Sequence, residues 1–289
     1  MPTLGIILSL GALIFWGFGD FFIQKSTRDV GDVPALFYIG AFGGIVLLPF
    51  VLPDLHLLAS GTLLILLLLA SFATFFGSLF DFEALKEGKI AIIEPIIGLE
   101  LPLIVGLSIA LHGEHLTILQ TGAMVLVFFG ILLCVTNHKV RIRSHKDLFE
   151  RGVVFAGLGA IGMALFSFLL GVSSQASSPL LAVWFVFAGG AVLCFLLLAV
   201  ERRLGSLVTG IKKFTLPVLA ESAFDTAAWL CFSAATVYLP ISIVTSISES
   251  YIALAVFLGL FVNHERIKRH QLIGALVAFA GVLVLARFA

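Results

Sequence analysis

The sequence has little charge: Asp, Glu, Lys and Arg make up 12% of its 289 residues, and 60% are hydrophobic. A typical soluble domain carries about 25% charged residues. No polar stretch is long enough to form a separate soluble domain, and the longest, residues 137–151, is predicted to be a loop. Apolar runs of about 18 residues or more recur along the whole chain. We therefore predict an all-α integral membrane protein.

The chain also lacks the residues that several other classes of protein need. Its three cysteines lie in apolar runs without a CxxC pair, so free thiols are expected and no disulfide. The stretch "HGEH" at 112–115 places its histidines across a glycine turn, without zinc-binding spacing, so we predict no metal site and no cofactor. Basic and acidic residues balance at 17 each, and this balance gives no indication of a nucleic-acid partner.

Ten apolar segments are long enough to cross a bilayer as helices. Sixteen of the 17 Lys and Arg residues fall in alternate loops, those after the first, third, fifth, seventh and ninth segments. The positive-inside rule places these five loops in the cytoplasm, with both termini outside the cell (inner) membrane. The predicted segments are 3–25, 33–52, 61–84, 89–111, 116–136, 152–173, 179–200, 214–237, 241–262 and 267–287.

The two halves of the chain match at a constant offset of 151 positions. Five helices is an odd number, so the second half must cross the membrane inverted relative to the first. We predict two inverted five-helix repeats, residues 1–136 and 152–289, joined by a cytoplasmic linker loop at 137–151. Inverted repeats are typical of secondary transporters that bind substrate near the midplane. The matched residues include Glu114 with Glu265, Gln120 with Gln271, Phe128 with Phe279 and Gly130 with Gly281.

The matched ends of the two halves resemble a known family. Each has an apolar helix, a short turn with a glutamate, and a last helix with Gln and Gly, in "HGEHLTILQ" and "NHERIKRHQ". This pattern resembles the EamA branch of the drug/metabolite transporter superfamily over nearly the whole chain. The resemblance implies export of small polar or amphipathic metabolites against proton uptake, by alternating access. It does not specify the substrate, because the family moves amino acids, other metabolites, sugars and drugs.

Six carboxylates interrupt the apolar segments without lysine or arginine at comparable depth. Counting about 1.5 Å per helical residue from the nearest segment end places Glu100, Asp225 and Glu249 near the midplane. A lone charge there costs about 3 kcal/mol, so these side chains must be protonated, face water or bind a cation. Burial and mutual repulsion favour the protonated form. We predict that substrate or protons bind at Glu94, Glu249, Asp225, Glu100, Glu221 and Asp20.

Aromatic residues accompany two of these acids at helical spacing. Trp16 precedes Asp20 by four residues, and Trp229 follows Asp225 by four. An acid one turn from an aromatic ring suits an ammonium or amine group, through charge and cation–π attraction. We therefore predict an amino acid or amine as substrate, in a cavity lined by Trp16, Trp229, Tyr251, Pro95 and Gly98. Packing is the alternative role for the aromatic residues.

Prolines at 95 and 102 predict a bend in the segment 89–111, which suits a helix that lines a pathway. The second half has Ser246 opposite Pro95 and gives no such signal. Gly98 matches Glu249 in the repeat, and Glu94 lies one turn before Gly98. Glu94 and Glu249 are therefore expected to face the same space.

Structural roles remain open for several of the acidic residues. Asp20 and Glu94 can reach the interface or pair with Lys25 and Lys89. Asp81 and Glu83, near Lys86, are expected to form a solvated cluster. Glu114 and Glu265 each precede a helix, so we expect them to stabilise that helix's N-terminus.

Two functions from other classes compete with a transporter. The carboxylates also fit a channel or a divalent-cation carrier. The stretch "GFGD" at 17–20 and "PAL" at 34–36 match short motifs of intramembrane aspartyl proteases, but "PAL" begins the very next segment instead of a distant one. We predict a transporter, not an enzyme, that acts as a monomer or homodimer on a small molecule within the lipid bilayer.

Overall fold

The computed structural model describes residues 2–87, 90–136, 151–212, 216–261 and 268–289. Every regular element in these ranges is helical. The predicted all-α class is therefore confirmed. The elements are α1 (Pro2–Val30), α2 (Asp32–Val51), the 3₁₀ helix η1 (Leu52–Ala59), α3 (Gly61–Glu87), α4 (Ile90–Ile97), α5 (Glu100–His112), α6 (Ile118–Val135), α8 (Arg151–Ala176), α9 (Pro179–Val200), α10 (Gly205–Lys212), α11 (Leu216–Thr236), α12 (Ile241–Ser248), α13 (Tyr251–Phe261) and α14 (Arg269–Phe288).

The described ranges contain nine stretches that are long and apolar enough to span a membrane. They correspond to nine of the ten predicted segments. The remaining segment is α11, which has 21 residues and is about 31 Å long at 1.5 Å per residue. Its mean hydropathy is lowered by Glu221 and Asp225, the acids that make it a functional candidate. The count of ten therefore stays a prediction.

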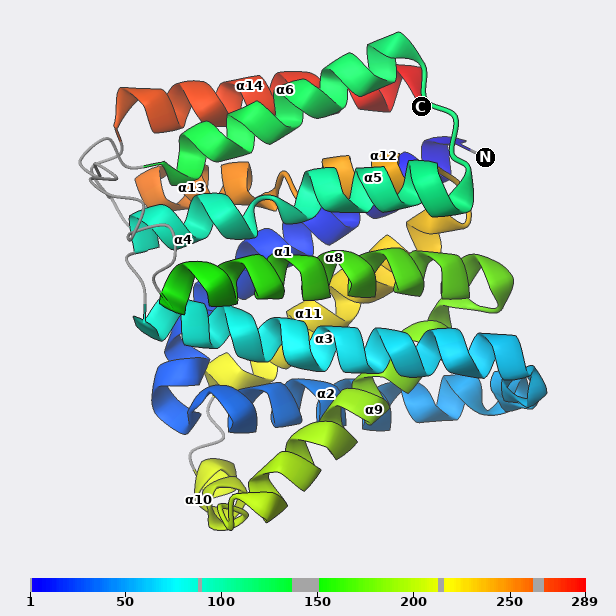
Figure 1. Ribbon diagram of the computed structural model, residues 1–289, viewed down its shortest axis with the longest axis vertical. Coiled ribbons are helices and arrows are strands. Elements are labelled where there is room, and N and C mark those ends of the chain that lie inside the picture. Colours follow the sequence, from blue (N-terminus) through cyan, green and yellow to red (C-terminus); the bar gives the residue numbers. More distant parts are fainter. Residues whose placement is uncertain (1, 88–89, 137–150, 213–215, 262–267) are drawn as a thin grey trace.

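Most helices run roughly along one direction, with α9 and α11 inclined to it, and the bundle has two ends (Figure 1). Both termini lie at one end, together with the end of α5 at His112 and the end of α11 at Thr236. We call this end the terminal face. At the opposite end α3 ends and α8 and α14 begin. We call it the basic face, because the helix ends there flank the loops whose sequences are rich in Lys and Arg.

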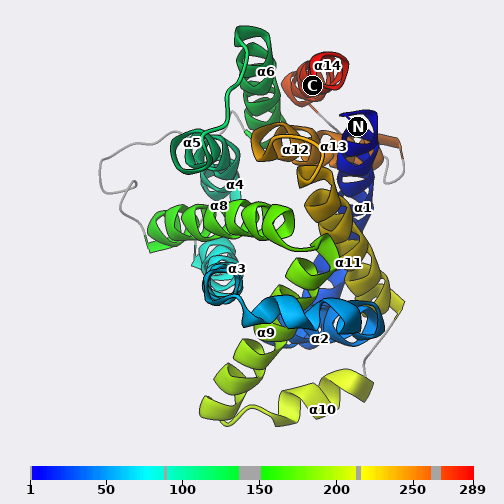
Figure 2. The same cartoon turned by 90° about the vertical axis from the view of Figure 1, so that its right-hand side faces the viewer.

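Helices of the two halves pack against one another in pairs. Figure 2 looks along the bundle and shows α6 beside α14, and α2 crossing α9. Two further pairs are α1 with α11 and α3 with α8. They are equivalent in the repeat, because the offset of 151 residues places α1 over α8 and α3 over α11. Each pair therefore joins one helix from each half, as expected for interlocked inverted repeats.

Glycines permit the close crossing of α6 and α14. A Cβ atom on Gly130 would lie 2.5 Å from the backbone nitrogen of Ala278, and one on Gly274 would lie 2.6 Å from the carbonyl oxygen of Gly130. Small residues allow helix backbones to approach in membranes, where van der Waals contact contributes much of the helix association. The α6–α14 pair therefore depends on these glycines.

We expect Gly130→Ala to lower the thermal unfolding temperature in detergent. Its added methyl would meet the backbone of α14, and such overpacking typically costs about 1–3 kcal/mol. Gly122→Ala is the matched control on the same helix, because nothing lies within 4 Å of its Cβ position. That control should be neutral or slightly stabilising. Equal effects of the two substitutions would contradict the crossing.

Two predicted segments are each interrupted at the same position of the repeat. Residues 89–111 and 241–262 were each expected to form one helix, with a bend in the first; the structure divides both. The first contains α4 and α5, separated at 98–99, and the second contains α12 and α13, separated at 249–250. The offset of 151 relates the two breaks residue by residue. The bend expected in the first half is confirmed, and the second half has one too.

The second break has a physical cause that requires no proline. The hydroxyl of Ser250 donates to the Ser246 carbonyl at 2.9 Å, the acceptor that the Ser250 backbone N–H would use in a regular helix. That N–H instead bonds the Ile247 carbonyl at 3.3 Å. Serine hydroxyls that bond four residues back often bend helices. The second break therefore lies in the run "TSISES", which contains no proline, and the Ser250 hydroxyl takes up a carbonyl at that position.

Candidate functional site

A cluster of aromatic rings joins four helices in the interior. Trp16 of α1 and Trp229 of α11 have ring centroids 4.7 Å apart in an edge-to-face arrangement. Phe166 of α8 lies 4.5 Å from Trp229, and Phe232 lies 5.4 Å from it. Tyr251, the first residue of α13, lies 5.9 Å from Trp16. The three aromatic residues singled out in the sequence, Trp16, Trp229 and Tyr251, are thus brought together in one place.

The carboxyl group of Asp225 lies beside both tryptophans. Each of their indole groups donates a hydrogen bond to it. No lysine or arginine occurs in the sequences of α11 or α13, and α1 has none before Lys25. The arrangement is therefore a carboxyl that accepts two indole N–H groups, within a cluster of aromatic rings. Chemically it is suited to a cationic amine, which gains charge pairing and cation–π contact together.

Three further carboxyl groups come together nearby from different helices. Glu100, the first residue of α5, lies within electrostatic reach of Glu249 and Asp81, and we call these three residues the carboxyl cluster. Glu100 also accepts a hydrogen bond of 3.2 Å from the hydroxyl of Ser167 on α8. Repulsion between like charges opposes ionisation of all three groups at once.

The aromatic residues and the carboxyl cluster are parts of one site. Phe166 and Ser167 are neighbours on α8; Phe166 contacts Trp229, and Ser167 contacts Glu100. Glu249 and Tyr251 lie on either side of Ser250 at the α12–α13 break. Both groups of side chains therefore lie against the same two elements, α8 and the break.

The structure places the other predicted residues less centrally. Glu221 is buried on α11, 1% exposed, one turn from Asp225 toward the basic face. Pro95 lies inside α4, and Gly98 lies in the break that follows it. The backbones of Asp20 and Glu94 are helical, but their side chains lie outside the described part of the structure. The expected meeting of Glu94 with Glu249 thus stays a prediction.

Sequence reasoning missed Asp81 and Ser167. Asp81 was expected in a solvated cluster, but its Oδ1 atom is buried, and a Cβ atom on Gly159 of α8 would overlap it. The sequence does contain an acid, Asp81, and a glycine, Gly159, that makes room for it on the neighbouring helix. This signal becomes visible only once α3 is known to pack on α8.

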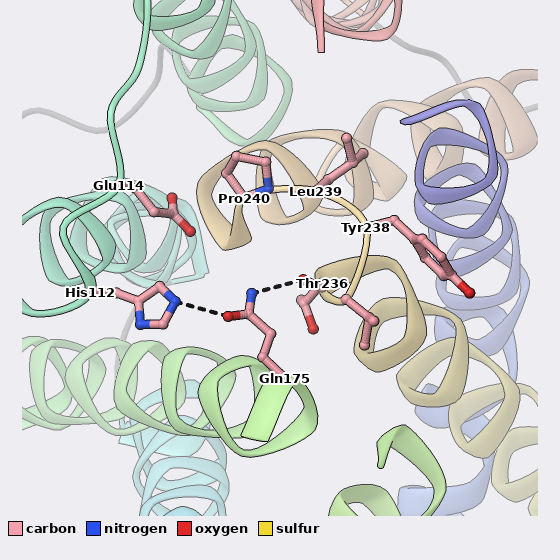
Figure 3. A pocket seen from close by; sticks show the side chains of 8 residues that line it. His112, Glu114, Gln175, Thr236, Tyr238, Leu239 and Pro240 are labelled. Atoms are coloured by element: carbon pink, nitrogen blue, oxygen red, sulfur yellow. Dashed lines mark hydrogen bonds between the residues drawn. The ribbon is translucent and has the colours of Figure 1, made fainter. Parts of the chain in front are cut away.

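The structure has a separate cavity of about 370 Å³ at the terminal face. Figure 3 shows His112, Glu114 and Gln175 on one side of it, opposite the chain from Thr236 to Pro240. None of the residues predicted to line a cavity contributes to it. Among the described residues, no three His, Cys, Asp or Glu side chains lie close enough to hold a metal ion.

Comparison with known proteins gives consistent results over the full length. The sequence profile of the EamA-like transporter family matches residues 3–136 and 150–287. An "uncharacterized transporter" of Archaeoglobus fulgidus is 26% identical over 285 residues, which cover 98% of both chains. A solved crystal structure, 16% identical, superposes with a TM-score of 0.74 over 98% of each chain, and this similarity concerns the fold alone.

Proposed function

The chain belongs to the EamA-like transporter family, and from this premise we propose that it is a secondary active transporter that exports small amine-bearing metabolites in exchange for protons. Amino acids and amines are the favoured substrates. The membrane is the cell membrane, with the basic face in the cytoplasm according to the positive-inside rule. One half of the chain moves against the other around the site between them.

The observation that carries the substrate class is the position of Asp225 between two indole groups. A carboxylate gives charge recognition of an ammonium group, and the aromatic cluster beside it can add cation–π attraction of about 2 kcal/mol when desolvated. The surrounding rings of Phe166, Phe232 and Tyr251 suit the apolar part of the substrate. A neutral sugar would leave the Asp225 carboxylate without a cation.

Proton coupling is supported by the carboxyl cluster of Glu100, Glu249 and Asp81. Glu100 lies within electrostatic reach of the other two carboxyl groups, and like charges oppose ionisation of all three at once, so we propose that the cluster holds a proton that can be exchanged. Glu100 and Glu249 each lie at one of the two equivalent breaks. Discontinuous helices of this kind surround the substrate and coupling-ion sites of secondary transporters.

The test is transport by the purified protein in liposomes under an imposed proton gradient. Amines, amino acids and sugars are added one at a time, and both substrate flux and proton movement are recorded. We expect a cationic amine or amino acid to move against the proton flow, whereas neutral sugars do not. Flux of sugars alone, or flux that is independent of the gradient, would contradict the proposal.

A further inference from the structure

A carboxylate of the first half binds the end of a helix in the second half. Glu114 lies in the turn between α5 and α6, and its Oε1 atom accepts the backbone N–H of Ile241 at 2.5 Å. Its Oε2 atom accepts the backbone N–H of Ser242 at 3.1 Å and also the Ser242 hydroxyl. Ile241 is the first residue of α12. Glu114 and Ile241 are 127 positions apart in the chain.

The N-terminus of α12 has no cap of its own. Its N-cap residue is Pro240, which makes no side-chain hydrogen bond, and its first turn contains no acidic residue. All eight residues of α12 are buried, so water cannot easily satisfy its first N–H groups. Buried donors without acceptors cost about 1–3 kcal/mol each. Glu114 therefore supplies what the helix lacks, an acceptor and a negative charge at the positive end of the dipole.

Glu114 was expected to stabilise the helix that follows it, α6, and this is wrong. The N-cap of α6 is Thr117, which forms a reciprocal pair of hydrogen bonds with Gln120. The left-handed conformation of Gly113, with φ of 69°, ends α5 and turns the chain so that Glu114 projects toward α12. The equivalent Glu265 lies outside the described residues.

A second contact also connects the end of α5 to the second half. The side chain of Gln175, at the end of α8, donates to the Thr236 carbonyl at 2.7 Å and accepts a hydrogen bond of 2.8 Å from His112. Figure 3 shows this chain of bonds beside Glu114 at the cavity of the terminal face. The end of α5 and the turn after it are therefore held to α8 and α12 of the second half, and α8 is in turn bonded to the end of α11.

We propose that Glu114 is a positioning residue that closes the terminal face by fastening α12 to the first half, and that its carboxylate must leave α12 when this face opens. The inference rests on the proposed alternating-access function. The eight residues of α12 cover about 12 Å and end next to Glu249, so movement of this half-helix would reach the carboxyl cluster of the central site. Glu114 itself binds no substrate.

The test measures access to the interior from each side and requires no knowledge of the substrate. Ser246 is fully buried on α12, one turn below Ser242, and Ser246→Cys serves as the reporter after the three native cysteines are replaced by serine. A membrane-impermeant maleimide is added to vesicles of each orientation. We expect Glu114→Gln to raise the rate of labelling from the terminal face at least tenfold. The rate of labelling from the basic face should stay unchanged or fall.

Two controls separate closure from simple loss of structure. Glu201→Gln removes an exposed glutamate that pairs with Arg203, and it should change neither rate. Faster labelling of the Glu114→Gln variant from both faces would indicate local unfolding and overturn the proposal, as would unchanged labelling from both. If Glu114→Gln fails to fold, Glu114→Cys combined with Ser242→Cys and a short bifunctional thiol reagent provides a second measurement. Cross-linking should stop labelling from the terminal face, and continued labelling would contradict the closure.

The labelling result is independent of the transport assay. A protein that moves no amine but shows one-sided labelling would keep the closure and lose the substrate class. A protein that transports amines with labelling unaffected by Glu114→Gln would keep the proposed function and lose the closure.

Discussion

Asp225→Asn is expected to reduce the apparent affinity for a cationic amine substrate about 100-fold. The asparagine side chain has nearly the same shape but cannot offer a charge to the ammonium group. Removing one partner of a buried charge pair costs about 2–5 kcal/mol, and roughly 3 kcal/mol corresponds to a factor of about 100. The measurement is substrate-dependent tryptophan fluorescence or stabilisation of the purified protein. Trp16 and Trp229 provide the signal beside the site.

Trp229→Phe serves as the matched variant for this experiment. Phenylalanine keeps an aromatic face toward the substrate but lacks the indole N–H that donates to Asp225. We expect a loss of about tenfold, because a hydrogen bond to a charged group contributes about 1.5–3 kcal/mol. Binding by Asp225→Asn equal to that of the unaltered protein would show that this carboxyl does not recognise the substrate.

Glu249→Gln is expected to lower proton-driven accumulation of substrate at least tenfold, while exchange of substrate across the membrane continues. Glutamine resembles a permanently protonated glutamate, so the cluster with Glu100 and Asp81 can no longer exchange its proton through this position. The rate of exchange should then depend less on pH, because one of the three carboxyl groups of the cluster can no longer ionise. The measurement compares accumulation under a proton gradient with counterflow at equal pH on both sides.

The controls for Glu249→Gln test charge and position separately. Glu249→Asp keeps an ionisable group at the break and should retain part of the accumulation. Asp81→Asn should reproduce a weaker form of the same defect, since Asp81 is the third member of the carboxyl cluster. If Glu249→Gln loses both counterflow and accumulation, this residue would be assigned to substrate binding or folding instead of coupling.

The organisation of the helices was largely predictable, because it follows from local properties. Apolar runs, basic loops and the offset of 151 positions are enough to indicate the membrane segments and the repeat. The bend in the segment 89–111 was expected from Pro95 and Pro102, because proline lacks the backbone N–H that a regular helix uses. The break at Glu249 was not, since a serine hydroxyl competes for a backbone carbonyl only in a particular side-chain conformation, as at Ser250.

The site was predicted in part. The i, i+4 spacing of Asp225 and Trp229 placed them on one face of α11, and the structure brings Trp16 to them. The spacing could not show which acids of different helices meet. Glu100 bonds Ser167 of α8. Its proximity to Asp81 depends on how α3 packs against Gly159, a contact between distant parts of the chain.

The sequence by itself determined that this chain is a membrane protein of two matched halves with carboxyl groups in apolar helices, because hydropathy and periodicity are properties of each segment alone. Only the tertiary structure decided which acids lie close to one another and which helix Glu114 stabilises. A negative charge in a turn can stabilise any helix N-terminus within reach, and α6 already has Thr117 as its cap. The first N–H groups of α12 are the donors that packing brings to Glu114.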